Sequence, residues 1–401
     1  MVLKSQIESA LNGQQKTYVK KKAGFSRSMN QTVELSESHI LIITGVRRCG
    51  KSTLMYQISK RVKKDFVYFN FEDPRVFDFE VSDFEKFDQL VGDDTLTYFF
   101  DEIQNVENWE VFIRHLHDRG KNICITGSNA SLLSQELGTK LTGRNIQVEL
   151  FPFSYKEFCG FKKLSPCLKS FENYLNIGGF PDFIQSQKNE QLQQLFKDII
   201  YRDIIVRYGI RNTTVFINIA LFLIANVGKE HSLNSIKNTF KVGSTNSVVD
   251  YVAWLEDSYL LFSVPRFSWS LKSISVNPKK VYTIDTGFAR ANSLSFSKDD
   301  GRLLENLVFL ELRRKHKEIY YFKEQGECDF LIKNGQNITN IIQVCYSVHQ
   351  ENFDREVNGI IEALNYFDKT EGTIVTLNQE DEILKDDKVI TLIPAWKWFD
   401  T

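Results

Sequence analysis

Residues 39–53 read His-Ile-Leu-Ile-Ile-Thr-Gly-Val-Arg-Arg-Cys-Gly-Lys-Ser-Thr, and their pattern indicates the fold class. The run up to Thr44 is short, apolar and rich in β-branched residues, as buried strands are. The segment from Gly45 to Ser52 matches G-x-x-x-x-G-K-[ST] at every fixed position, and the apolar residues after Lys51 recur at helical spacing. A strand, a glycine-bounded loop and a helix in this order predict a phosphate-binding loop.

The residue types in this loop suit ATP with Mg²⁺. Backbone N–H groups at a helix N-terminus, together with the positive end of the helix dipole, favour bound anions, so we expect the β- and γ-phosphates there. Lys51 would contact these phosphates, Ser52 would ligate Mg²⁺, and Thr53 could contact the α-phosphate. The predicted ATP-binding residues are Gly45, Val46, Arg47, Arg48, Cys49, Gly50, Lys51, Ser52 and Thr53.

Length and composition limit the function classes. A chain of 401 residues predicts two or three domains, and its 42% hydrophobic and 25% charged residues are typical of a soluble globular protein. The formal charge of −1 excludes a global basic field, so contact with nucleic acid would need a local patch. Six cysteines without a C-x-x-C pair favour a reducing compartment over disulfides or structural zinc. With no apolar stretch of about 18 residues, we expect a cytoplasmic protein without membrane contact.

A second strand pattern, Leu-Thr-Tyr-Phe-Phe-Asp-Glu at residues 96–102, ends in two adjacent acids. An apolar strand brings its last residues to the carboxyl edge of a parallel sheet, where the phosphate-binding loop also lies. We therefore expect Asp101 to hold Mg²⁺ through water and Glu102 to polarise the water that attacks the γ-phosphate. Two acids after a strand can also be plain helix caps, but their position about fifty residues after the loop favours the catalytic interpretation.

Two further residues complete the predicted catalytic set. The apolar stretch 122–128 ends in Ser128, which could sense the γ-phosphate or the attacking water, although ordinary turn chemistry is an equal alternative. Residues 131–144 are predicted as a helix and loop that end in Arg144, a candidate arginine for the γ-phosphate in its own chain or in a neighbouring subunit. The predicted strands of this half are 39–44, 65–71, 96–102, 122–128 and 145–150.

Taken together, these motifs resemble the prokaryotic family of predicted AAA+ superfamily ATPases. The resemblance rests on Thr-Gly-Val-Arg-Arg-Cys-Gly-Lys-Ser-Thr, Phe-Phe-Asp-Glu-Ile-Gln, Thr-Gly-Ser, Leu-Thr-Gly-Arg and Leu-Phe-Pro-Phe-Ser-Tyr-Lys-Glu-Phe, and on later matches at 178–181, 201–205 and 302–308. It implies an ATPase core with an additional strand between the loop strand and the Asp-Glu strand, followed by a C-terminal domain of unknown function. The residues it carries over are Lys51, Ser52, Asp101, Glu102, Ser128 and Arg144.

The middle of the chain contains a pattern of two short helices and a strand. Residues 232–240 and 245–257 are predicted helices around a glycine-containing turn, and 259–264 is a predicted strand. This order suggests a helix-turn-helix with a wing, in which residues 244–247 would face the bases of double-stranded DNA and nearby lysines its phosphates. A rigid spacer or a unit that binds a protein partner is the alternative.

The C-terminal third has a damaged nuclease pattern. An acid on a helix, an acid on a strand and [E/Q]-x-K on the next strand would form a PD-(D/E)xK-type site for Mg²⁺. The corresponding positions are Glu305, Asp329, Gln343 and Cys345. Because a thiol cannot supply the fixed charge of the lysine that Cys345 replaces, we expect a nuclease-like fold without efficient cleavage. Lys323 or Lys333 could take over that role, and Glu305 could instead be a buried acid paired with a neighbouring cation.

The sequence thus predicts an α/β chain with a parallel P-loop NTPase (AAA+/ASCE) sheet core, a helical region with a winged helix and an α/β nuclease-like C-terminal domain. The predicted parts are an N-terminal helical lead-in (1–36), the ATPase domain (37–153), the helical and winged-helix-like region (154–275) and the nuclease-like domain (276–401). We expect Mg²⁺-dependent ATP hydrolysis, with the nucleotide state moving a module that contacts DNA. The alternatives are a slow nucleotide switch that docks a protein partner and an ATP-linked metal-dependent nuclease. The sequence is also compatible with a homo-oligomer.

Overall fold

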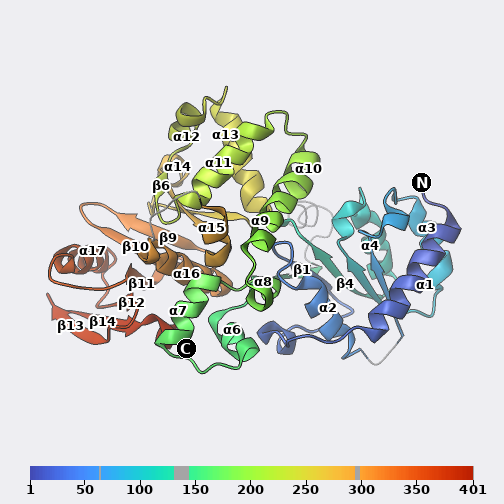
Figure 1. Ribbon diagram of the computed structural model, residues 1–401, viewed down its shortest axis with the longest axis horizontal. Coiled ribbons are helices and arrows are strands. Elements are labelled where there is room, and N and C mark those ends of the chain that lie inside the picture. The colour runs from blue at the N-terminus through green and yellow to red at the C-terminus, as the bar shows by residue number, and fades with distance from the viewer. Residues whose placement is uncertain (63–64, 131–143, 294–298, 401) are drawn as a thin grey trace. The chain divides into compact units, whose positions relative to one another are not determined.

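The computed structural model of the protein describes residues 1–62, 65–130, 144–293 and 299–400 (Figure 1). The chain forms two compact units. The first comprises Met1–Phe151 together with Asp257–Tyr259, and the second comprises Pro152–Glu256 and Leu260–Thr401. Within the described residues, no helix is long and apolar enough to cross a membrane. The first unit has one sheet and the second has two, and each unit has its own packed core.

Five parallel strands form the sheet of the first unit, in the order β2-β3-β4-β1-β5. Their bounds are Ile40–Thr44 (β1), Phe66–Asn70 (β2), Thr97–Asp101 (β3), Asn122–Gly127 (β4) and Asn145–Glu149 (β5). Strand β4 lies between the loop strand β1 and the acid-bearing strand β3, which is the additional-strand order that the family resemblance implied. The predicted P-loop NTPase core is confirmed, and each predicted strand agrees with the structure to within one residue at either end.

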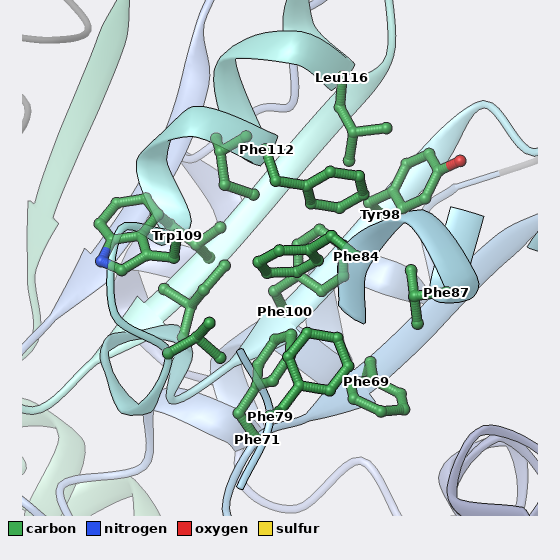
Figure 2. Packing of buried hydrophobic residues seen from close by; sticks show 14 of the residues in the cluster. Phe69, Phe71, Phe79, Phe84, Phe87, Tyr98, Phe100, Trp109, Phe112 and Leu116 are labelled. Atoms are coloured by element: carbon green, nitrogen blue, oxygen red, sulfur yellow. The ribbon is translucent and has the colours of Figure 1, made fainter. Parts of the chain in front are cut away.

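Helices and an aromatic core cover this sheet. The α-helices are Lys4–Lys20 (α1), Lys51–Ser59 (α2), Asp83–Val91 (α3) and Trp109–Asp118 (α4), and the 3₁₀ turns are Ser28–Gln31, Pro74–Val76 and Ile103–Asn105. Figure 2 shows the core on one face, where strand residues that point the same way meet α3 and α4. Phe84 of α3 stacks on Phe112 of α4, with ring centroids 4.1 Å apart.

Helix α1 covers the edge strand β2. The Gln14 amide accepts from the Asn70 N–H at 2.7 Å and donates to the Asn70 carbonyl at 3.1 Å. The Gln15 amide accepts from the Tyr68 N–H and donates to the Phe66 carbonyl, both at 3.0 Å. Two glutamine side chains therefore satisfy main-chain groups that a neighbouring strand would otherwise pair.

The second unit contains two sheets. A mixed sheet of six strands has the order β13-β14-β12-β11-β10-β9, and an antiparallel sheet of three has the order β6-β8-β7. Their bounds are Glu230–His231 (β6), Leu261–Pro265 (β7), Lys279–Thr283 (β8), Ile319–Lys323 (β9), Glu327–Asn334 (β10), Asn337–Cys345 (β11), Glu371–Thr376 (β12), Asp381–Lys385 (β13) and Lys388–Pro394 (β14). The predicted C-terminal α/β domain is thus present.

Helices pack around and between these sheets. They are Tyr155–Lys162 (α6), Leu168–Ile177 (α7), Pro181–Ser186 (α8), Asn189–Asp198 (α9), Val206–Tyr208 (α10), Thr213–Ala225 (α11), Leu233–Phe240 (α12), Thr245–Asp257 (α13), Leu271–Val276 (α14), Thr286–Asn292 (α15), Asp300–Lys315 (α16), Phe353–Tyr366 (α17) and Ala395–Trp398 (α18), with a π-helix at Ile199–Ile205. The two sheets share one body, because the Phe267 N–H after β7 donates to the Tyr321 carbonyl of β9 at 2.8 Å. The Tyr321 hydroxyl in turn donates to the Pro278 carbonyl just before β8 at 2.8 Å.

A pair of phenylalanines tests the aromatic core. Phe84 is 2% exposed inside it, whereas Phe77 in the same connection is 84% exposed. Phe84→Ala should lower the free energy of unfolding of the first unit by about 3–5 kcal/mol, because it removes a large buried ring and leaves a cavity. Phe77→Ala should change it by less than about 0.5 kcal/mol. Hydrogen exchange of peptides from β3 and β4 in rising urea measures both, and equal losses would contradict the assignment of Phe84 to the core.

Candidate active site

The loop after β1 has the backbone that a phosphate-binding loop needs. Gly45 and Gly50 adopt φ of 148° and 104°, a region that side chains disfavour. A Cβ on Gly45 would lie 2.1 Å from the Leu150 carbonyl oxygen, so no larger residue fits there. Helix α2 begins directly at Lys51, and its first N–H groups therefore lie at the end of the loop. The sequence pattern and the local geometry agree.

The Lys51 ammonium sits inside the loop. Its side chain is only 3% exposed, and Nζ donates to the carbonyls of Gly45 and Val46 at 3.1 and 3.2 Å. It also lies 3.5 Å from Glu102 Oε1. Burial opposes the charge, but the Glu102 carboxylate together with Cys49 and Asp101 outweighs it and raises the pKa of Lys51, which keeps the ammonium charged. The two residues that the sequence predicted for γ-phosphate and water are thus in contact.

Asp101 is held at the end of β3 by hydroxyl groups. The Tyr68 hydroxyl donates to Oδ2 at 2.9 Å and the Thr126 hydroxyl donates to Oδ1. The Ser52 hydroxyl of the loop also hydrogen-bonds this carboxylate. Burial and the neighbouring Glu102 charge raise the pKa of Asp101, although these hydroxyls partly offset the effect. The two predicted Mg²⁺ ligands, Ser52 and Asp101, therefore lie together.

Glu102 occupies a strained backbone position. Its φ of 53° and ψ of 46° lie in the left-handed region, which typically costs about 1–3 kcal/mol for a residue with a side chain. The N–H donates to the Thr126 hydroxyl at 3.0 Å, and Gln104 Nε2 donates to Oε2 at 2.5 Å. Burial opposes ionisation of Glu102, but the Lys51 ammonium, the Gln104 amide and the Arg47 charge together outweigh it and lower the pKa of Glu102. The carboxylate is thus ionised and fixed in orientation.

Ser128 and Arg144 lie in different places. Ser128 follows β4 at the same sheet edge, is 2% exposed, and receives a long hydrogen bond of 3.4 Å from Gln104. Arg144 precedes β5, which runs parallel to β1 with Asn145 opposite Ile40, so it lies at the opposite edge of the sheet, about 20 Å from Gly45 along the strands. Its guanidinium pairs with Asp118 at 2.8 Å. The structure does not bring Arg144 to the loop of its own chain, and a role in a neighbouring subunit stays a prediction. Residues 131–143 of the predicted helix and loop lie outside the described residues.

Arg27 is a contact of the loop that the sequence did not suggest. Its side chain is buried, and the guanidinium donates to the Cys49 carbonyl inside the loop and to the Phe151 carbonyl after β5, both at 2.8 Å. Arg27 lies in the segment predicted only as a helical lead-in. No local pattern marks it, because its partners are 22 and 124 residues away in the sequence.

The second predicted site, in the second unit, contains a lysine from an unexpected strand. Glu305 of α16 and Asp329 of β10 meet at Lys280 of β8, whose Nζ lies 3.1 and 2.7 Å from their carboxylates. Gln343 lies beside them and accepts the Asp329 N–H at 3.0 Å. Burial and the Asp329 charge raise the pKa of Glu305 to about 7. The predicted acids are therefore brought together.

Among the described residues, Lys323 and Lys333, the predicted substitutes for the lysine that Cys345 replaces, do not contact Glu305 or Asp329. Lys323 pairs with Glu230 at 2.6 Å and with Glu327 at 3.3 Å, and Lys333 pairs with Glu318 at 3.0 Å. Cys345 is buried, and its thiol lies 3.2 Å from the Ser347 carbonyl. No clear sequence signal marks Lys280, because it is the second of two lysines that begin the strand pattern 279–284, and the pattern alone does not show which of them is buried.

Comparisons with known proteins agree with the first site. A family model described as an AAA domain matches residues 37–159, and one described as a domain of unknown function matches residues 168–299. An uncharacterized protein of Methanocaldococcus jannaschii is 38% identical, over 91% of this chain and 89% of its own. An uncharacterized protein of Haemophilus influenzae is 29% identical, over 84% of this chain and 90% of its own.

Among solved structures, a mutant of RuvB from Thermotoga maritima is 13% identical and covers 66% of this chain and 91% of its own. Its TM-score is 0.31, which is too low to carry an argument about fold or function. The AAA-domain model is therefore the comparison that covers the residues of the first site, and the M. jannaschii relative extends the similarity over most of the chain.

The contact of Arg27 with the loop generates a test. Arg27→Met should weaken binding of ATP by roughly tenfold and lower the stability of the first unit by about 1–3 kcal/mol, because the carbonyls of Cys49 and Phe151 lose their buried donor. Binding of a fluorescent ATP analogue measures the first effect and urea unfolding the second. Arg75→Met is the matched control, since its guanidinium is 42% exposed beside Asp73. If both variants bind the analogue as the unchanged protein does, Arg27 does not support the loop.

Proposed function

The chain belongs to the family of AAA+ P-loop ATPases that carry a C-terminal domain of unknown function, and on this premise we propose that it binds ATP with Mg²⁺ and hydrolyses it. One observation carries the proposal. Lys51 of the loop lies 3.5 Å from Glu102, and Glu102 directly follows Asp101 at the same sheet edge. A buried cation, a general base and a metal-binding carboxylate are the parts that transfer of a phosphoryl group to water requires.

The residues around Asp101 fit Mg²⁺. The donors that meet there are the Ser52 hydroxyl and the Asp101 carboxylate, and both are oxygen ligands of the kind that Mg²⁺ prefers. When bound, Mg²⁺ would neutralise charge on the β- and γ-phosphates. The Tyr68 hydroxyl of β2 and the Thr126 hydroxyl of β4 orient the Asp101 carboxylate, so that the position of this carboxylate does not depend on the ion.

The remaining residues would divide the chemistry as follows. The Lys51 ammonium would leave its contact with Glu102 for the γ-phosphate, because a phosphate carries more negative charge than the carboxylate. Glu102, ionised and held by Gln104, would then accept a hydrogen bond from the attacking water. Ser128 at the end of β4 would contact the water or the γ-phosphate, and Thr53 the α-phosphate.

We propose further that the nucleotide state moves a C-terminal module that contacts double-stranded DNA. Helices α12 and α13 are separated by a short turn at 241–244, and their buried residues are Ile236 of α12 and Val248 and Leu255 of α13. Ser244 and Asn246 at the start of α13 are exposed, as is Lys241 in the turn. Exposed polar groups at a helix start beside a lysine are compatible with DNA contact. The alternative, a slow switch that docks a protein, has no specific observation in its favour.

Two substitutions separate binding of ATP from its hydrolysis. Lys51→Ala should abolish both, because the phosphates lose their buried cation. Glu102→Gln should leave the dissociation constant for ATP within a few-fold and lower turnover by at least about 100-fold, because the amide cannot act as a base. Calorimetry with Mg²⁺-ATP and phosphate release measure the two quantities. Glu80→Gln is the control, as its side chain is an exposed carboxylate of the same unit. Unchanged turnover in Glu102→Gln would remove Glu102 from the mechanism.

The proposed DNA contact is tested by salt dependence. Affinity for a duplex, followed by fluorescence anisotropy, should fall as salt rises, and Lys241→Glu should weaken it and reduce the slope of log K against log salt by about 1. Lys162→Glu on α6 is the control for a charge change elsewhere in the unit. If the protein does not bind duplex DNA at low salt and its turnover is indifferent to DNA, the slow switch replaces this proposal.

A further inference from the structure

A large cavity in the second unit contains a buried lysine among acids. Its volume is about 1010 Å³, and its lining includes Lys280, Glu305, Glu327, Asp329, Gln343 and Glu356. Lys280 Nζ lies 2.7 Å from Asp329 Oδ1, 2.7 Å from Glu327 Oε1 and 3.1 Å from Glu305 Oε1. Its side chain is 3% exposed. An ammonium has three N–H donors, and here each has a carboxylate within reach.

The oxygen atoms around this lysine are already used. Asp329 Oδ2 accepts the Val344 N–H at 3.0 Å, and Glu305 Oε1 accepts the Tyr282 hydroxyl at 2.7 Å. The Gln343 amide oxygen accepts the Asp329 N–H, and its nitrogen donates to Glu356 at 2.7 Å. A divalent ion could not bind among these carboxylates, because the Lys280 ammonium already occupies that position.

A nuclease-like fold implies a metal at the acid pair, and the residues present do not fit one. In the part of the chain that the structure describes, no group of three or more His, Cys, Asp and Glu side chains is arranged to hold a metal ion. The two acids of the expected site, Glu305 and Asp329, are both paired with Lys280, and the neighbouring Glu327 pairs with it as well. The lysine also has a different origin from the expected one, because β8 belongs to the three-stranded sheet and not to the six-stranded sheet that carries Asp329.

We infer that the Lys280 ammonium takes the place of a divalent cation in this cavity. The acids then hold a cation that belongs to the chain itself, and the three-stranded sheet is attached to α16 and β10 through it. The site binds no metal while Lys280 is present. Its carboxylates still form a cation site, so removal of the ammonium alone should create a binding site for a divalent metal. This inference does not depend on the proposed ATPase activity.

Binding of Mn²⁺ to the full chain without nucleotide tests this inference. Equilibrium dialysis compares the unchanged protein with Lys280→Met, which keeps the length of the side chain but removes its charge. Lys280→Met should bind Mn²⁺ at least about tenfold more tightly than the unchanged protein. The additional Asp329→Asn substitution should abolish this gain. Lys323→Met is the matched control, because Lys323 also contacts Glu327 but is 41% exposed, and it should bind Mn²⁺ as the unchanged protein does.

A second measurement covers the outcome in which Lys280→Met is unfolded without metal. Circular dichroism then follows folding as Mn²⁺ is added, and recovery of the folded state supports the inference. Three results would overturn it. The first is that the unchanged protein binds Mn²⁺ and Asp329→Asn abolishes this binding. The second is that Lys280→Met gains no Mn²⁺ binding when it is folded, or does not recover its fold when Mn²⁺ is added. The third is Mg²⁺-dependent cleavage of duplex DNA that both Lys280→Met and Asp329→Asn abolish. The last would make Lys280 a catalytic lysine.

Discussion

The parallel pairing of β4 with both β1 and β3 is the constraint on which the first site depends. Thr44 lies opposite Gly127, and Phe100 lies opposite Ile125. Because the three strands run the same way and end at similar heights, the loop after β1, the acids after β3 and the polar residues after β4 reach one edge. The Thr126 hydroxyl joins them, since it donates to Asp101 and accepts the N–H of Glu102. Backbone hydrogen bonds thus place side chains that are distant in sequence.

The sequence was sufficient where a function is encoded in consecutive residues. Lys51, Asp101 and Glu102 each follow a strand pattern, and the end of a parallel strand fixes the sheet edge at which they lie. Arg144 precedes its strand instead of following it, and the same rule places it at the far edge. Arg27 and Tyr68 were not predicted, because Arg27 acts through two long-range hydrogen bonds and Tyr68 through one, and neither leaves a periodic signal.

In the second unit, the prediction succeeded for elements and was incomplete for their connections. The helix of Glu305 and the strands of Asp329 and Gln343 are where the pattern placed them. Strand β8 was read as the start of the C-terminal domain, yet it pairs with β6 and β7 and directs Lys280 toward the acids. The alternation of apolar and polar residues along one strand does not show which other strand it pairs with. Only the sheet order therefore shows that Lys280 reaches the acids from the three-stranded sheet.

The glutamines of α1 have a consequence for assembly. An open edge strand is a template for strand addition by another chain, which leads to unwanted pairing or aggregation. Gln14 and Gln15 imitate an extra strand on β2 with their amides, and they do so from a helix, which cannot extend the sheet further. The β2 edge is therefore closed to self-association through strand pairing. Any homo-oligomer that grows by strand addition to this sheet would have to use its other end, where β5 lies.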